Sequence, residues 1–251
     1  RDLYLKPSIE NHQRLSFLIN DIERIKTWHT LEKQIQKKLK IKKKIEFNNH
    51  HLCHLASAYF PSGFQKAVIV SYDGLGESES GAFALGNKGK ITVLNHKNLY
   101  PDSLGLLYSA ITFYLGWKPF CDEGIIMGLA PYGNSHEKIR NTNKTYYDLF
   151  KDIICIDKNN PLKYKINKKW IAYHLKRNVW VSNEFIKIFG KPKKYSNKLT
   201  KHHMNIAKAL QDRLEYVVCK QLRYLKKKYK IENLCLAGGV ALNCVANGKI
   251  L

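Results

Sequence analysis

The sequence predicts an α/β protein, and three features along the chain support this. A β-branched run at 67–73 and two further apolar segments predict an antiparallel meander of three strands, the other two at 81–85 and 91–94. A long amphipathic helix is expected from about 202 to 229. A last strand at 233–237 then leads through Gly238 and Gly239 into a predicted helix. This order of elements indicates an α/β plan with a nucleotide-style turn.

The remaining segments are expected to be mainly helical. Residues 1–48 are charged, with a helical apolar face formed by Leu15, Leu18, Ile19, Ile22 and Ile25. A short helix is expected over 50–60, and a second begins behind Ser103 as N-cap and ends at Gly116. Residues 135–200 carry no clear motif but are rich in Lys, Asn and aromatic residues. We expect them to elaborate the core.

Composition excludes several classes of protein. The 251 residues are 44% apolar, which argues against wholesale disorder, and no apolar run approaches the roughly 18–20 residues of a membrane span. Six cysteines without a Cys-x-x-Cys pair favour a reducing, cytoplasmic location over a disulfide framework. The net charge is +23, yet only seven of the 43 basic residues are Arg, the residue that base and phosphate recognition favours. A basic, solvated surface is therefore expected rather than a nucleic-acid partner.

His50, His54 and Asp73 are candidate metal ligands. Two His residues four apart lie on one face of a helix, and Asp73 ends the strand that follows. Two imidazoles and one carboxylate with open positions suit a divalent first-row metal, Fe(II) above all, with Mn(II) and Zn(II) as alternatives. A chance pairing is the competing interpretation, because the chain has ten His residues, some of them adjacent.

Two glycine pairs are candidate anion-binding turns. Gly74 and Gly76 are expected to join two strands, to permit positive φ and to leave backbone N–H groups free for an anion. Gly238 and Gly239 precede a predicted helix N-terminus, where a phosphate can approach unpaired N–H groups. Each pair, taken alone, is also consistent with an ordinary structural turn.

The order of these features resembles one family, the carbamoyltransferases of the nodulation type and of antibiotic biosynthesis, in their Kae1-like domain. The similar segments are His50 to Ala58, Val70 to Glu77, Ser103 to Ser109 with Leu115-Gly116, Glu123 to Gly133, and Leu236 to Asn243 with Asn247-Gly248. The resemblance is strong over about 45–133 and 202–251. It implies an actin-like ATPase (ribonuclease H-like) fold, here partial and carrying a helical insertion.

The resemblance also implies an activity. Such enzymes make a carbamoyl-adenylate from ATP and carbamoyl phosphate and transfer the carbamoyl group to a hydroxyl of a small-molecule acceptor, with help from a metal. Carried over by position, the metal ligands are His50, His54 and Asp73, and the residues that contact ATP or carbamoyl-adenylate are Gly74, Gly76, Gly238, Gly239 and Asn243. Neither a membrane nor a nucleic acid is implied, and a homodimer is the assembly to consider.

We expect the chain to be one partial domain of a longer protein. Its parts are a lead-in (1–48), a metal-site and hairpin core (49–134), an insertion (135–200) and a C-terminal part with the long helix and the Gly-Gly turn (201–251). The family's general-base His and a further Asp ligand would fall outside these residues, as would the YrdC-like domain that forms the adenylate. Ile125 replaces a Lys that is common in the family. The chain alone is therefore expected to be inactive in the full reaction.

Two other functions stay open. A threonylcarbamoyl transferase acting on tRNA would share the fold and the His-x-x-x-His site, and the basic charge favours it. A non-catalytic nucleotide-binding module of the same fold is the second alternative. Salt-dependent tRNA binding would identify the former, whereas an inert module need not retain metal.

Overall fold

The computed structural model describes residues 22–176 and 178–250, which fall into two compact units. One unit contains residues 22–48 with the described part of 172–179, and the other contains 49–171 with 180–250. In the first unit, helix α2 spans Ile22–Leu39. The predicted apolar face at Leu15, Leu18 and Ile19 lies outside the described residues.

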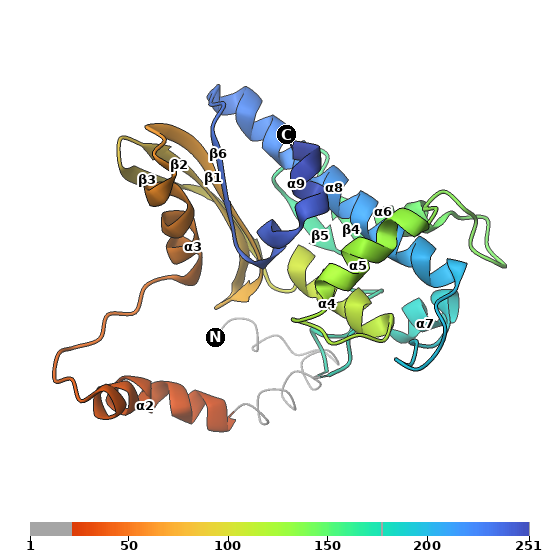
Figure 1. Ribbon diagram of the computed structural model, residues 1–251, viewed down its shortest axis with the longest axis horizontal. Coiled ribbons are helices and arrows are strands. Elements are labelled where there is room, and N and C mark those ends of the chain that lie inside the picture. Colours follow the sequence, from red (N-terminus) through yellow and green to blue (C-terminus); the bar gives the residue numbers. More distant parts are fainter. Residues whose placement is uncertain (1–21, 177, 251) are drawn as a thin grey trace. The chain divides into compact units, whose positions relative to one another are not determined.

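The second unit is built on a mixed four-stranded sheet in the order β3-β2-β1-β6 (Figure 1). Strands β1 (Lys66–Gly76), β2 (Glu79–Asn87) and β3 (Lys90–Leu99) form the predicted antiparallel meander. Strand β6 (Leu234–Ala237) pairs in parallel with β1, so that Ser71 lies opposite Ala237. The α/β prediction and the predicted strand order are confirmed.

Helices cover both faces of the sheet. Helix α3 (His50–Tyr59) packs its Leu55 and Tyr59 side chains in one core cluster with Ile69 of β1. Because side chains alternate along a strand, Tyr72 points to the opposite face, where its hydroxyl donates to Gln221 of α8 (Lys201–Tyr229). The sheet is therefore sandwiched, and β1 is buried from Ala67 through Tyr72 because both of its faces are covered.

Helices α4 (Leu104–Tyr114) and α5 (Glu123–Leu129) connect the meander to the insertion. Ser103 is the predicted N-cap, since its hydroxyl accepts from the Leu106 N–H, and Gly116 follows the helix with a φ of +94°. Short 3₁₀ turns follow two helices, at Phe60–Ser62 and Ala130–Tyr132. No helix in the described ranges has an apolar stretch long enough to cross a membrane.

The segment 135–200 is only partly helical. It contains α6 (Tyr146–Ile153) and α7 (Asn183–Phe189), but also a two-stranded sheet of β4 (Ile154–Ile156) and β5 (Tyr164–Ile166). The insertion that was predicted to be helical is therefore helical in part and also contains strands. Buried aromatic side chains such as Phe150 and Phe185 form its interior, and this explains the aromatic content seen in the sequence.

Both glycine turns differ from their predicted form. Strand β1 continues through Gly76, the chain reverses at Glu77 and Ser78, and neither Gly74 nor Gly76 has a positive φ. After β6, Gly239–Leu242 form a 3₁₀ turn, and helix α9 begins only at Cys244 and ends at Ile250. The predicted helix start directly behind Gly238-Gly239 was therefore wrong.

Candidate metal centre

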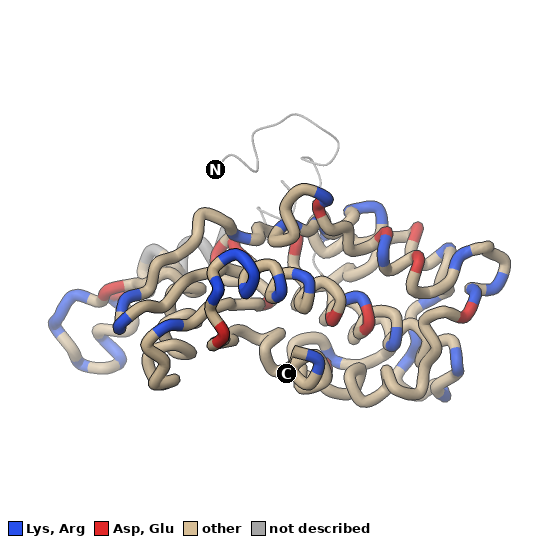
Figure 2. Tube along the Cα trace, turned by 90° about the horizontal axis from the view of Figure 1, so that it is seen from above, with Lys and Arg blue, Asp and Glu red and all other residues tan. Residues whose placement is uncertain are grey.

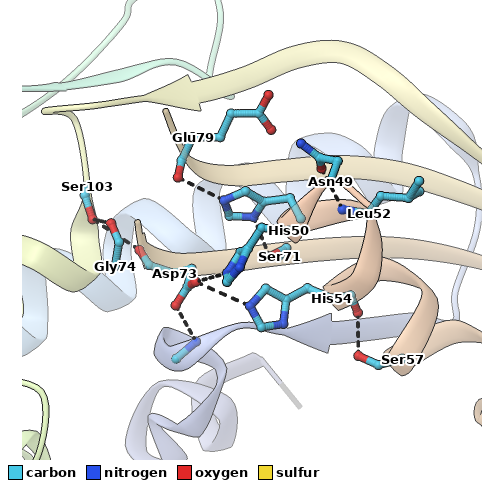
Figure 3. A network of polar contacts seen from close by, with 12 residues as sticks. Asn49, His50, Leu52, His54, Ser57, Ser71, Asp73, Gly74, Glu79 and Ser103 are labelled. Carbon is cyan, nitrogen blue, oxygen red and sulfur yellow. Dashed lines mark hydrogen bonds and ion pairs between the residues drawn. The ribbon is translucent and has the colours of Figure 1, made fainter. Parts of the chain in front are cut away.

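His50, His54 and Asp73 converge on one point in the second unit (Figure 3). His50 Nε2 lies 2.7 Å and His54 Nε2 lies 3.3 Å from Asp73 Oδ2. One ligand atom from each residue lies within 4.8 Å of the others. Ligands bonded at about 2.1 Å to a single ion are separated by about 3 Å, so the donor atoms need little movement to share one.

Helix α3 places both imidazoles on the side facing β1. Asn49 caps the helix, with its side-chain oxygen accepting from the Leu52 N–H, so the helix begins immediately at His50. The i, i+4 spacing then puts His50 and His54 one turn apart, with ring centroids 4.5 Å from each other. Their side chains are 41% and 29% exposed, which leaves room for further ligands.

Asp73 lies where the ladder between β1 and β2 is interrupted, between Tyr72 and Gly76. Burial raises the pKa of Asp73, but hydrogen bonds from His50 and from the N–H groups of Gly239 and Gly74 outweigh it and bring the pKa to about 2. The side chain is therefore an anionic carboxylate at neutral pH. Its Oδ1 accepts the Gly239 N–H at 3.0 Å, which leaves Oδ2 facing the two imidazoles.

Gly76 is required by the position of His50. A Cβ atom at Gly76 would lie 2.1 Å from His50 Cδ2 and 2.8 Å from His50 Cβ, so no larger residue fits without moving the imidazole. The sequence singled out Gly76, but for backbone freedom in a turn. The structure instead shows a close approach between a strand backbone and a ligand side chain.

Gly238 and Gly239 hold the other side of the carboxylate. Gly238 has a φ of +87°, and a Cβ there would lie 2.2 Å from the Tyr72 carbonyl oxygen. This close approach brings the Gly239 N–H to Asp73. The N–H groups of Gly239 and Gly74 were predicted to be free for an anion. In the structure both face the Asp73 carboxylate and are already hydrogen-bonded to it.

Asn243 lies behind this turn in a buried pair with Gln211 of α8. Asn243 Nδ2 donates to Gln211 Oε1 at 2.9 Å, and Gln211 Nε2 donates to Asn243 Oδ1 at 3.0 Å. Asn243 Oδ1 also accepts the Ala246 N–H at the start of α9, and the Tyr108 hydroxyl donates to Gln211. In this arrangement Asn243 joins the turn to α8, with no polar atom left for open solvent.

Two residues that the site analysis of the sequence did not single out hold the candidate metal ligands in position. The Ser103 hydroxyl donates to the Gly74 carbonyl at 2.6 Å, which ties the N-terminus of α4 to the residue after Asp73. His51 is fully buried, and its ring nitrogens contact Ser71 Oγ at 2.9 Å and the Glu79 carbonyl at 3.0 Å. His51 thereby anchors α3 to β1 and β2 between the two ligands. Its position directly after His50 was the available signal.

Comparison with known proteins identifies the family of this chain. A family model described as the carbamoyltransferase N-terminus matches residues 4–251. The chain belongs to this carbamoyltransferase family. Among its carbamoyltransferase-family relatives is nodulation protein NolO of Bradyrhizobium diazoefficiens, which is 36% identical over 81% of this chain and 33% of its own length. The resemblance inferred from the five motifs is confirmed.

Two further relatives extend this picture of the family. Nodulation protein NolNO of Sinorhizobium fredii is 36% identical over 83% of this chain and 27% of its own length. An uncharacterised protein of Synechocystis is 38% identical over 82% of this chain and 32% of its own length. The chain thus spans about a third of the length of these carbamoyltransferase-family relatives.

Proposed function

We propose that this chain is the metal-binding part of an O-carbamoyltransferase with an actin-like ATPase fold. It would receive the carbamoyl group of a carbamoyl-adenylate, made from ATP and carbamoyl phosphate, and direct it to a hydroxyl of a small-molecule acceptor. The convergence of His50, His54 and Asp73 on one point carries this proposal. Family membership supports the carbamoyl chemistry.

The donor set fits a divalent first-row metal. Two imidazoles and one carboxylate that binds through a single oxygen leave coordination positions open, as Fe(II) sites of this composition do. When bound, such a metal would polarise the carbamoyl carbonyl and stabilise the negative charge that grows on its oxygen during attack by the acceptor hydroxyl. His50, His54 and Asp73 would hold it there.

The other residues of the chain act by positioning. Gly239 donates to Asp73 Oδ1 and so orients Oδ2 toward the two imidazoles. Gly76 leaves space for the His50 ring. We further propose, from the resemblance, that the phosphate of the adenylate lies along the backbone around Gly74, Gly76, Gly238 and Gly239, where it would compete with Asp73 for the Gly74 and Gly239 N–H groups. Asn243 would support this turn from behind.

Metal analysis of the purified chain tests the proposal. After anaerobic incubation with Fe(II) and removal of free metal, we expect about one ion per chain. The double substitution His50→Ala and His54→Ala should abolish retention, whereas His136→Ala, which removes an exposed histidine elsewhere, should not. A double variant that keeps the full metal content would contradict the ligand assignment.

The distribution of charge favours a small-molecule acceptor over tRNA. Figure 2 shows Lys and Arg spaced along much of the described chain, with acidic residues among them. Only seven of the 43 basic residues are Arg, the side chain that phosphate recognition favours. Affinity for tRNA that falls steeply with salt would instead favour the threonylcarbamoyl alternative. We also expect that the chain alone, given ATP and carbamoyl phosphate, forms no carbamoyl-adenylate. Formation of the adenylate by these 251 residues would contradict that expectation.

A further inference from the structure

Three aromatic side chains form a solvent-accessible cluster in the second unit. Phe120, in the loop between α4 and α5, makes an edge contact with Trp180 at a centroid distance of 5.4 Å. Phe113 of α4 lies 6.3 Å from the same indole. Phe120 is 64% exposed and Phe113 is 41% exposed, so this aromatic cluster (Phe113, Phe120 and Trp180) presents apolar ring surface to solvent.

The aromatic cluster adjoins the metal centre through Gly74. A Cβ atom built on Gly74, the residue after Asp73, would lie 4.0 Å from Phe120 Cε1. The Phe120 ring therefore reaches the strand end that carries the carboxylate ligand. Leu75, the next residue along β1, is also exposed. The exposed rings thus lie beside the residue that follows Asp73, one of the three residues that converge on the candidate metal centre.

The backbone at Phe120 is held in an unfavourable conformation. Its φ is +64°, in the left-handed region that a large side chain rarely adopts. The Phe120 N–H donates to Glu123 Oε1 at 2.6 Å, and the Ser109 hydroxyl donates to the same oxygen at 2.5 Å. An exposed aromatic ring gains little from burial. A strained backbone that is held in place to present such a ring is typical of a binding site.

We propose that the aromatic cluster is the acceptor subsite, and that Phe120 is a specificity-determining residue that stacks on the apolar face of a ring in the acceptor. This inference rests on the proposed function, because it takes the alcohol as the group that approaches the metal centre. Aromatic faces bind the C–H surface of a sugar ring or a second aromatic ring through apolar contact, without needing charge. A sugar ring and an aromatic ring of the acceptor would both present a flat apolar face to Phe120.

The cluster also gives the insertion a role. Trp180 is the part of the cluster contributed by residues 135–200, while Phe113 and Phe120 come from the segment that follows the meander. The insertion therefore supplies a wall of the subsite in addition to its own core. Changes in the insertion would alter which ring the enzyme accepts without touching the metal ligands.

Binding by the intact chain tests this proposal without requiring turnover. The probes are chitotriose and 2-naphthylmethanol, which separate a sugar ring from an aromatic ring, and mannitol as an acyclic alcohol, each measured by calorimetry and saturation-transfer NMR. We expect at least one ring alcohol to bind more tightly than mannitol, and Phe120→Ala to weaken that binding by about tenfold. Phe60→Ala, which removes another exposed phenylalanine at the far end of α3 from His50, should leave it unchanged.

Two further variants separate binding from folding. Phe120→Gly and Phe120→Asn relieve the left-handed backbone, so both should lose ring binding while their melting temperature stays the same or rises. The proposal is overturned if no ring alcohol binds better than mannitol, the result expected if another polypeptide covers this surface. It is also overturned if the Phe120 variants bind like the wild type.

Metal content measured on the same samples distinguishes failure of the acceptor-subsite proposal from failure of the proposed function. Full metal retention without ring selectivity overturns the acceptor subsite alone. Loss of metal from the wild-type chain overturns the proposed function.

Discussion

Gly239 donates its backbone N–H to Asp73 Oδ1 at 3.0 Å, although 166 residues separate the two positions in sequence. This bond forms because β6 pairs in parallel with β1, which brings the turn after β6 against the end of β1. It fixes one carboxylate oxygen and leaves the other facing His50 and His54. The sheet therefore brings the candidate metal ligands and the turn that orients them together from three distant segments.

Substitution of Gly76 should damage the metal centre specifically. In Gly76→Ala the new Cβ meets the His50 ring and its Cβ, so we expect the imidazole to be displaced and metal affinity to fall by about tenfold to a hundredfold. Titration with Fe(II) or Zn(II) measures this. Gly128→Ala is the matched control, because a Cβ there meets nothing within 4 Å and lies in helix α5. Equal affinities in the two variants would contradict the steric argument.

Gly238→Ala should destabilise the fold through two separate effects. Gly238 has a φ of +87° and a ψ of 166°, a conformation that is essentially confined to glycine and costs about 1–3 kcal/mol in any residue with a Cβ. The contact with the Tyr72 carbonyl adds to it, since the Cβ would lie 2.2 Å from that oxygen. Gly190 has a similar φ of +86°, but a Cβ there would meet nothing within 4 Å. Gly190→Ala therefore isolates the cost of the positive φ. Urea unfolding should show a larger loss of unfolding free energy for Gly238→Ala than for Gly190→Ala. Equal losses in the two variants would contradict the steric effect of the Tyr72 carbonyl.

The pair formed by Gln211 and Asn243 should show energetic coupling. Removing either amide leaves its buried partner amide with unsatisfied polar atoms. Removing both avoids this penalty, and the loss that remains is that of the other partners of the pair, among them the Ala246 N–H and the Tyr108 hydroxyl. The two single alanine variants should therefore each lose about 1–3 kcal/mol of unfolding free energy, and the double variant should lose less than their sum. A double-mutant cycle from urea denaturation measures the difference. Simple additivity would show that the pair contributes nothing beyond its separate contacts.

His51 should make the stability of the metal-free chain depend on pH. Burial lowers the pKa of His51 in the folded state below its ordinary value of 6.5. The unfolded chain therefore binds a proton at His51 more readily than the folded chain does. The contribution of neutral His51 to the free energy of unfolding is fully present above pH 6.5 and is lost as pH falls toward the folded pKa. The loss is at most about 1.4 kcal/mol per pH unit.

The variant His51→Gln isolates this contribution from that of other titrating groups. Urea unfolding at pH 7.5, 6.5 and 5.5 should show a smaller decline for the variant than for the wild type, although the variant is less stable at pH 7.5 because one anchor of α3 is lost. Parallel curves for the two proteins would show that His51 does not titrate over this range.

Local patterns in the sequence predicted most of the fold. The β-branched run ending at Asp73, the Ser103 cap and the apolar periodicity of α8 depend on neighbours a few residues away, and each appears as expected. The turns were predicted less well. Gly74 and Gly76 were assigned to a hairpin turn because glycine is common there. In the folded chain, Gly76 is needed instead for the His50 ring, which only tertiary packing brings near.

The three residues of the candidate metal centre were predicted from the sequence alone, because the i, i+4 spacing of His50 and His54 and the order of the five motifs are properties of the chain itself. Tertiary structure decided how the centre is held. The Gly239 bond to Asp73, the Gln211–Asn243 pair and the contact of Phe120 with Trp180 all join segments that meet only when the sheet and α8 pack. Such contacts depend on distances in space, and a single sequence encodes those distances only through the complete fold.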